Sequence, residues 1–201
     1  MKDWSGDKNS IFKIIAASNH TKSERQNEDF YATDPIVIDK LLTVEKPSNF
    51  IFECACGKGH LSERLKEFGY SVHSSDLIDR GYSGATVEDF FSIKEIDQRY
   101  DILTNPPYKY AKEFVLHSLN LLADNRKCYM FLKTTFLEGK TRYKDLFSKY
   151  PPKVVYVFIE RVLCAKNAEF EWIKASGGSA VSYSWFVFEK GYKGETVIKW
   201  I

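Results

Sequence analysis

Residues 49–60 read NFIFECACGKGH, and this stretch decides which class of fold the sequence predicts. An apolar run ends at Glu53, two glycines follow at Gly57 and Gly59, and a segment of helical period begins at His60. Glycines at such a strand-to-helix turn let the backbone approach a ligand that faces the helix N-terminus. The stretch is interpreted as a nucleotide-binding turn, although an ordinary tight turn fits the same pattern. Residue 62 is Ser, which breaks the full GxGxxG pattern and disfavours a nicotinamide enzyme.

Outward from this turn, apolar runs of strand length alternate with segments of helical period. Strands are predicted at 49–54, 70–74, 86–89, 101–104, 127–132, 153–159 and 183–189, helices at 60–68, 109–122 and 143–150, and a candidate short strand at 196–200. This alternation predicts an α/β fold with a doubly wound, mostly parallel seven-stranded sheet. No clear helix separates the last strands, so the last strand pair is expected to be antiparallel.

Length and composition fit one globular domain with a hydrophobic core. The chain has 201 residues, of which 44% are hydrophobic and 28% are charged. Residues 1–26 are mostly polar and are predicted to form an N-terminal arm, while residues 27–201 form the domain. Residues 160–182 show no clear period, so this segment is either a substrate loop or a surface excursion.

Charge, cysteines and hydropathy narrow the classes of function. The formal net charge is only +2, but residues 109–149 hold nine basic against four acidic residues, which fits either a phosphate-binding face or a solvated helix surface. The four cysteines form no CxxC pair, so they predict neither a disulfide frame nor a metal site. Without a signal peptide or an apolar run of membrane-spanning length, the chain is predicted to be cytoplasmic and to have no membrane contact.

Two further motifs follow predicted strands. Asp76 ends the strand after the glycine turn, where an acid in a doubly wound sheet accepts hydrogen bonds from ribose hydroxyls, although a loop carboxylate fits there too. Residues 104–108 read TNPPY, and the two prolines stiffen the turn because each fixes its own φ and the first also restricts Asn105.

The TNPPY turn has the groups that methylation of an amine requires. The Asn105 side-chain oxygen and the Pro106 carbonyl can accept the hydrogens of an exocyclic amine such as that of adenine. These acceptor dipoles would stabilise the positive charge that builds on the nitrogen during transfer. Tyr108 can stack on the base, which is worth roughly 1–3 kcal/mol. A Pro-Pro turn with a packed tyrosine is the structural alternative.

With these motifs, the sequence resembles the S-adenosylmethionine-dependent amino-methyltransferases over about residues 27–190. It is most similar to the N6-adenine DNA methyltransferases of phage and restriction-modification type. The resemblance implies S-adenosylmethionine as cofactor and direct methyl transfer, with adenine in DNA as the leading substrate. It implies a catalytic set, which is Asn105, Pro106, Pro107 and Tyr108. It also implies a cofactor-binding set, which is Phe30, Tyr31, Thr33, Glu53, Cys54, Ala55, Gly57, Gly59, Asp76, Leu77, Asp89, Phe90 and Asn105.

The family pattern divides these residues by the part of the cofactor that they contact. Phe30, Tyr31 and Thr33 are expected to contact the methionine moiety of the cofactor. Glu53 is expected near the methionine or ribose part of the cofactor. Asp76 is expected at the ribose, with Leu77 and the pair at 89–90 at the adenine.

Several alternatives remain open at the level of sequence. The chain offers no room for a large recognition region, so weak sequence specificity or none is expected. The same NPPY motif resembles that of RNA amino-methyltransferases and of enzymes that methylate a glutamine amide in release factors. A non-catalytic module that keeps the cofactor fold is the last alternative. A nucleic-acid partner, DNA rather than RNA, is favoured, and the oligomeric state is open.

Overall fold

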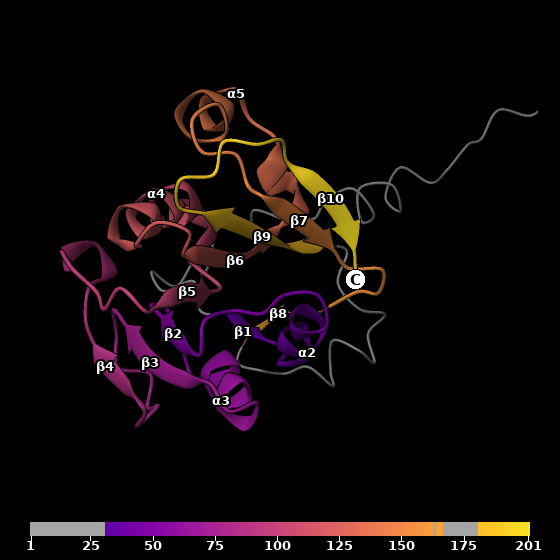
Figure 1. Cartoon of the computed structure of the whole chain (residues 1–201). Coiled ribbons are helices and arrows are strands. Elements are labelled where there is room, and N and C mark those ends of the chain that lie inside the picture. The colour runs from indigo at the N-terminus through magenta and orange to yellow at the C-terminus, as the bar shows by residue number, and fades with distance from the viewer. Residues whose placement is uncertain (1–30, 163, 167–180) are drawn as a thin grey trace, which may run out of the picture.

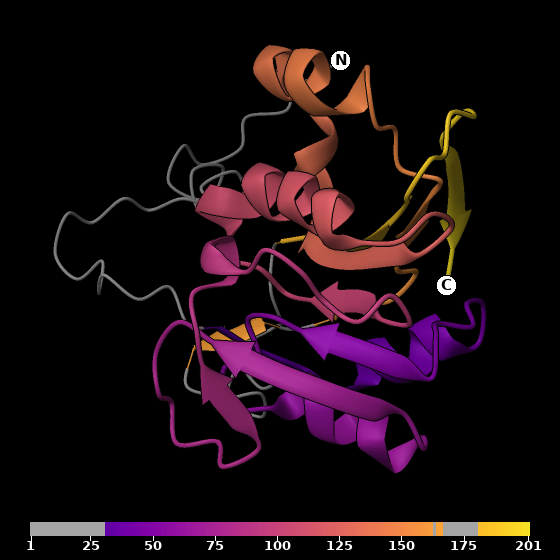
Figure 2. The same cartoon turned by 60° about the vertical axis from the view of Figure 1, so that its left-hand side comes forward.

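The computed structural model describes residues 31–162, 164–166 and 181–201, which form a central sheet with helices on both faces (Figures 1 and 2). The strands are β1 (Tyr31–Thr33), β2 (Phe50–Glu53), β3 (Ser71–Asp76), β4 (Ala85–Val87), β5 (Asp101–Thr104), β6 (Lys127–Lys133), β7 (Val154–Val157), β8 (Cys164–Lys166), β9 (Tyr183–Glu189) and β10 (Val197–Trp200). The α-helices are α2 (Ile36–Leu42), α3 (His60–Glu67), α4 (Ala111–Leu121) and α5 (Lys140–Arg142). Single turns of other helix types are η1 (Phe90–Ser92), η2 (Tyr108–Tyr110), η3 (Thr134–Leu137) and η4 (Tyr143–Phe147).

The main sheet has the strand order β10-β7-β9-β6-β5-β2-β3-β4. All neighbouring pairs are parallel except those of β9, which runs antiparallel to both β6 and β7. The prediction of a doubly wound, mostly parallel sheet with an antiparallel strand near the chain end is therefore confirmed. The sheet has eight strands where seven were expected, because the candidate strand at 196–200 pairs with β7.

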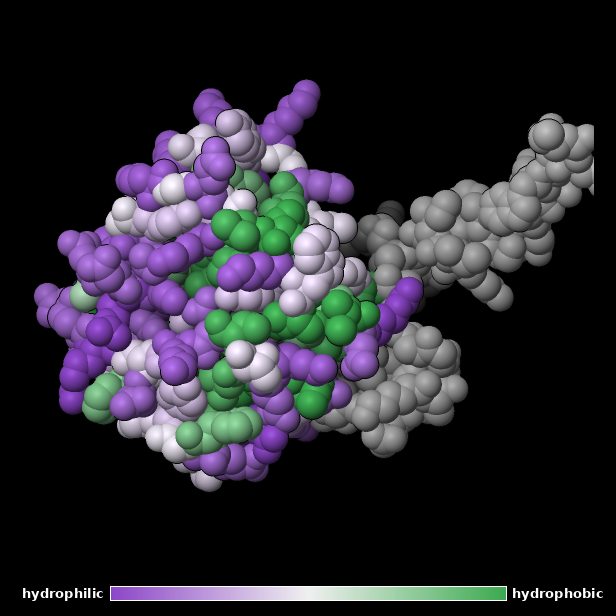
Figure 3. Space-filling model, turned by 45° about the vertical axis from the view of Figure 1, so that its right-hand side comes forward, coloured by the Kyte–Doolittle hydropathy of each residue, from purple (hydrophilic) through white to green (hydrophobic). Residues whose placement is uncertain are grey.

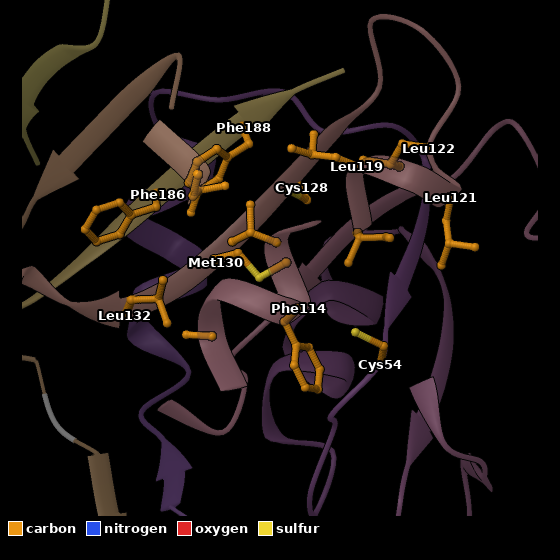
Figure 4. Close-up of a cluster of buried hydrophobic side chains, with 14 of the residues drawn as sticks. Cys54, Phe114, Leu119, Leu121, Leu122, Cys128, Met130, Leu132, Phe186 and Phe188 are labelled. Atoms are coloured by element: carbon orange, nitrogen blue, oxygen red, sulfur yellow. The ribbon is translucent and has the colours of Figure 1, made fainter. Parts of the chain in front are cut away.

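Each face of the sheet buries its own hydrophobic cluster. On one face, Phe114 and Leu119 of α4 pack over Met130 of β6 and Phe186 of β9 (Figure 4). On the other face, the apolar sides of α2 and α3 cover β2, β5 and β9; the contributing residues are Val37, Ile38, Leu41, Leu61, Leu65, Ile51, Leu103 and Trp185. Strands β5, β6 and β9 are buried on both faces, which explains why their sequences are nearly continuous apolar runs.

Helix α3 is bounded by two glycines with positive φ. Gly59 has φ +79° at its start, and Gly69 has φ +87° just after its end, a conformation that side chains with a Cβ rarely adopt. Between them, Leu61 and Leu65 are buried at i, i+4 spacing. Arg64 on the same helix donates from Nε and Nη2 to the two carboxylate oxygens of Asp39 at 2.6 and 2.7 Å, which joins α3 to α2.

Two features were absent from the sequence expectations. Helix α2 was not predicted, and β1 pairs antiparallel with β8 in a separate two-stranded ribbon.

Strand β10 lies at one end of the main sheet, and two of its apolar side chains are largely exposed: Ile198 is 47% exposed and Trp200 is 69% exposed. Apolar surface gathers on the side that carries this strand (Figure 3). The predicted arm at 1–26 lies outside the described residues, as do residues 163 and 167–180 of the candidate substrate loop.

Candidate active site

Four adjacent strands bring the predicted motifs to one edge of the sheet. In the order β5-β2-β3-β4, the chain leaves these strands at Asn105, at the glycine turn, at Asp76 and just before Asp89. The strands are parallel and in register, with Phe52 opposite both Ile102 and His73, and Asp76 opposite Val87. Their carboxyl ends therefore meet at the edge where doubly wound folds bind ligands.

The glycine turn is tied directly to the end of β3. The Gly57 amide donates to Oδ2 of Asp76 at 2.9 Å, and the Cys56 amide donates to the Ser75 carbonyl at 3.0 Å. Gly57 has φ +57° and Gly59 has φ +79°. A Cβ on Gly59 would lie only 2.6 Å from ring carbons of Tyr82, so this glycine is required by both its backbone conformation and a close neighbour.

The carboxylate of Asp76 has neighbours on several sides. Besides Gly57, it accepts from the Ile78 amide at 3.1 Å and from Nε of Arg80 at 3.3 Å. Beside it lies a cavity of about 260 Å³, lined by Gly57, Asp76 and residues of the segment 78–87. Leu77, the next residue along the chain, is 64% exposed and is not one of the residues that line this cavity.

Glu53 and Cys54 support the turn from inside the protein. Glu53 is 1% exposed, and it accepts a hydrogen bond from the Ser62 hydroxyl, whose oxygen is also 2.6 Å from that of Ser74. Burial raises the pKa of Glu53 to about 8. Cys54 lies in the core and Ala55 is partly buried against it, so burial raises the pKa of the Cys54 thiol and keeps it protonated.

Ser62 is a residue whose role the sequence did not reveal. It occupies the position where dinucleotide fingerprints have their third glycine, and here its hydroxyl binds the buried carboxyl of Glu53. The signal was present as a polar residue on the apolar face of a predicted helix.

Of the predicted pair Asp89 and Phe90, the first lies at the surface and the second in the core. Asp89 is exposed and accepts from the Phe91 amide at 2.9 Å, which caps the turn η1. Phe90 is only 3% exposed, and its ring stacks on Phe114 with centroids 4.9 Å apart. Asp89 is therefore the member of the pair that faces solvent at the strand-end edge.

The side chain of Asn105 has one end bound and the other free. Its Nδ2 donates to Oγ1 of Thr33 at 2.7 Å and lies 3.9 Å from the sulfur of Cys164. Its Oδ1 is buried and has no hydrogen-bond partner among the residues that the structure describes. A buried acceptor without a partner is uncommon in native proteins, and a catalytic role, a bound ion or an ordered water can account for one.

Tyr108 continues the site on the same side. Its hydroxyl is 3.5 Å from the Cys164 sulfur, and its ring centroid is 6.1 Å from that of Tyr183. Burial raises the pKa of the Tyr108 phenol well above its usual value, so the hydroxyl stays protonated. The Pro106 side chain is buried and Pro107 is partly buried, in keeping with a rigid turn.

The segment at 30–33 is only partly described. Phe30 lies outside the described residues, and for Tyr31 only the backbone, opposite Lys166 in the β1–β8 ribbon, is described. Thr33 is 4% exposed and lies opposite Cys164 in the same ribbon. Cys164 was not predicted as a site residue, because it falls in a segment without sequence periodicity.

The basic residues at 109–149 do not form one face. Lys133 lies at the site, with Nζ 5.1 Å from the centroid of the Tyr108 ring, and none of the ion pairs among the described residues involves it. Arg126 and Lys127 instead lie at the opposite edge of the sheet, where Lys127 pairs with Glu45 at 2.8 Å.

Over residues 31–162, 164–166 and 181–201, no group of three His, Cys, Asp or Glu side chains is arranged to hold a metal ion. In the same part of the chain, no helix has both the length and the hydropathy to cross a membrane.

Comparison with known proteins identifies the fold. No family model and no curated protein matches the sequence. The chain resembles a modification subunit of a putative type I restriction enzyme from Vibrio vulnificus with a TM-score of 0.56 and 13% identity, over 94% of this chain and 48% of that one. It also resembles a putative class I S-adenosylmethionine-dependent methyltransferase from Listeria monocytogenes, with a TM-score of 0.53 and 14% identity. That match covers 83% of this chain and 62% of the Listeria protein. For a putative RNA methyltransferase from Pyrococcus horikoshii, the TM-score is 0.50 and the identity 11%. That match covers 78% of this chain and 81% of the Pyrococcus protein.

The fold is therefore the Rossmann-like fold of these methyltransferases. The chain spans less than two thirds of the length of the Vibrio and Listeria proteins.

Proposed function

For a chain with the Rossmann-like fold of the class I methyltransferases, we propose S-adenosylmethionine-dependent methylation of an exocyclic amino group, with N6 of adenine in DNA as the substrate. The observation that carries this proposal is the Asn105 side chain, whose Oδ1 is buried and lacks a partner among the described residues while its Nδ2 is bound. An acceptor oxygen held in this way can receive the hydrogen of an incoming amine.

The residues of the neighbouring strand ends fit the cofactor. Asp76 offers a carboxylate at the end of β3 for ribose hydroxyls, and Asp89 offers another at the end of β4 for the adenine amine. The exposed Leu77 offers an apolar surface for the adenine ring. When bound, the cofactor supplies an electrophilic methyl group on a sulfonium.

Each part of the NPPY turn has a distinct role in this proposal. Asn105 Oδ1 and the Pro106 carbonyl accept the two hydrogens of the amine and stabilise the charge that develops on nitrogen. Pro107 fixes the turn, and Tyr108 packs beside the base. In duplex DNA the adenine has to be flipped out of the stack, at a cost of a few kcal/mol.

Lys133 favours a nucleic acid over a protein substrate. Its ammonium lies beside Tyr108 without a carboxylate partner in the described part of the chain, so it is available to a phosphate.

The experiment combines substrate identification with one variant. The protein is incubated with radiolabelled S-adenosylmethionine and DNA, RNA or release factor, and labelled DNA is digested to nucleosides for identification by mass. We expect N6-methyladenine from DNA. Asn105→Ala is expected to keep cofactor affinity in calorimetry and to lose about 100-fold or more in turnover. Asn120→Ala, an exposed asparagine on α4, is the matched control and is expected to behave as wild type.

Other outcomes point to other functions. Label in RNA or in release factor would replace the DNA assignment by one of these substrates. Normal turnover by Asn105→Ala would contradict the catalytic assignment. No label together with no cofactor binding would indicate a non-catalytic module.

A further inference from the structure

We propose that Thr33 is a positioning residue that holds the Asn105 amide in the orientation needed for catalysis, an inference that rests on the proposed function. The resemblance to known methyltransferases implies instead that Thr33 contacts the cofactor. The two roles predict different measurements.

The contact itself is specific and joins distant parts of the chain. Thr33 Oγ1 accepts from Asn105 Nδ2 at 2.7 Å across 72 positions of sequence. Thr33 is 4% exposed, and Asn105 Oδ1 is fully buried, so water cannot easily replace this hydrogen bond.

The orientation of the amide decides whether the site attracts or repels an amine. With Nδ2 on Thr33, the free end is Oδ1, an acceptor that suits the N–H groups of the substrate. If the amide were rotated by 180°, Nδ2 would face the substrate, and its hydrogens would oppose those of the amine. Removing the Thr33 acceptor leaves a buried Nδ2 unsatisfied and lowers the preference for the productive orientation.

Cys164 lies beside Thr33 and offers Asn105 Nδ2 a further acceptor. Its sulfur is also 3.5 Å from the Tyr108 hydroxyl. The same sulfur lies 3.9 Å from Asn105 Nδ2, as a second, weak acceptor. Both neighbours of Nδ2 therefore accept hydrogens.

The β1–β8 ribbon keeps these two acceptors together. Thr33 and Cys164 lie opposite each other in its antiparallel register. The ribbon thus joins the segment before the glycine turn to the segment after β7 and places both against the NPPY turn.

The experiment compares Thr33→Val, which keeps the shape but removes the acceptor, with Thr33→Ser, which restores the hydroxyl. We expect Thr33→Val to lower kcat by about tenfold or more, while KM and the calorimetric affinity for S-adenosylmethionine stay near wild type. Thr33→Ser is expected to recover most of the rate. In an Asn105→Ala background, Thr33→Val is expected to cause no further loss, because both changes act through one group.

A second readout does not depend on activity. In wild type, the side-chain NH₂ of Asn105 is expected to give an NMR signal protected from exchange, and Thr33→Val is expected to shift this signal and speed its exchange. An unchanged signal would overturn the inference even if no substrate is ever methylated. Weaker cofactor binding at unchanged kcat would assign Thr33 to the cofactor instead. A wild-type protein that methylates nothing but shows the NMR change would contradict the proposed function and leave the orientation of Asn105 established.

Discussion

Replacing Gly59 with alanine tests how the glycine turn is built. We expect two separate losses in the free energy of unfolding. Gly59 has φ +79°, a backbone conformation that costs an L-residue roughly 1–2 kcal/mol. The new Cβ would also lie 2.6 Å from the Tyr82 ring, whereas carbon atoms prefer about 3.5–4.0 Å. Tyr82 then has to move, although its hydroxyl binds Glu63 and Lys66.

The structure offers a matched control for each cost. Gly69 has φ +87°, and a Cβ there would meet nothing within 4 Å beyond its own chain neighbours, so Gly69→Ala isolates the backbone cost of roughly 1–2 kcal/mol. Gly59→Ala is expected to lower the free energy of unfolding by about 1–2 kcal/mol more than Gly69→Ala. The reason is that moving Tyr82 breaks hydrogen bonds worth about 0.5–1.5 kcal/mol each. In a Tyr82→Ala background, this extra cost is expected to disappear.

The assay is urea denaturation of the single and double variants, with free energies of unfolding compared in a double-mutant cycle. Equal losses at Gly59 and Gly69, or losses at Gly59 and Tyr82 that simply add, would refute the reasoning. Such a result would mean that Tyr82 does not lie over the turn in solution.

Two more predictions concern charge. Burial raises the pKa of Glu53 from 4.5 to about 8, so its contribution to stability is present below pH 4.5 and is lost as pH rises toward 8, by up to about 1.4 kcal/mol per pH unit. Glu53→Gln should therefore become more stable relative to wild type across that range in urea denaturation, and parallel pH curves for the two proteins would count against a buried carboxyl. If Lys133 contacts a phosphate, Lys133→Met should reduce the slope of log affinity for DNA against log salt by about 0.9 and leave cofactor affinity unchanged. An unchanged salt slope would place Lys133 away from the DNA.

The local motifs were predictable because their signals lie in neighbouring residues. The apolar run before Glu53, the glycines at 57 and 59 and the prolines at 106–107 each fix a strand end or a turn through backbone preferences of their own. Asp76 and the TNPPY turn were both predicted to follow strands, and in a parallel sheet such positions lie at the same edge.

The sequence alone was a poorer guide to what each side chain does at that edge. Glu53 and Phe90 stay predicted cofactor-binding residues; the structure adds that their side chains are buried, one against Ser62 and the other against Phe114. Burial depends on which distant elements cover a residue, and local pattern does not contain that information.

By itself, the sequence determined the order of the main-sheet strands and of helices α3 and α4, the glycine turn and the rigid NPPY corner, because periodicity and turn chemistry act over a few residues. Only the tertiary structure decided that β9 inserts between β6 and β7 and that β1 pairs with β8. It alone set Thr33 against Asn105. Such pairings join segments far apart in the chain, and they form because packing and hydrogen bonding across the whole fold favour them over other arrangements.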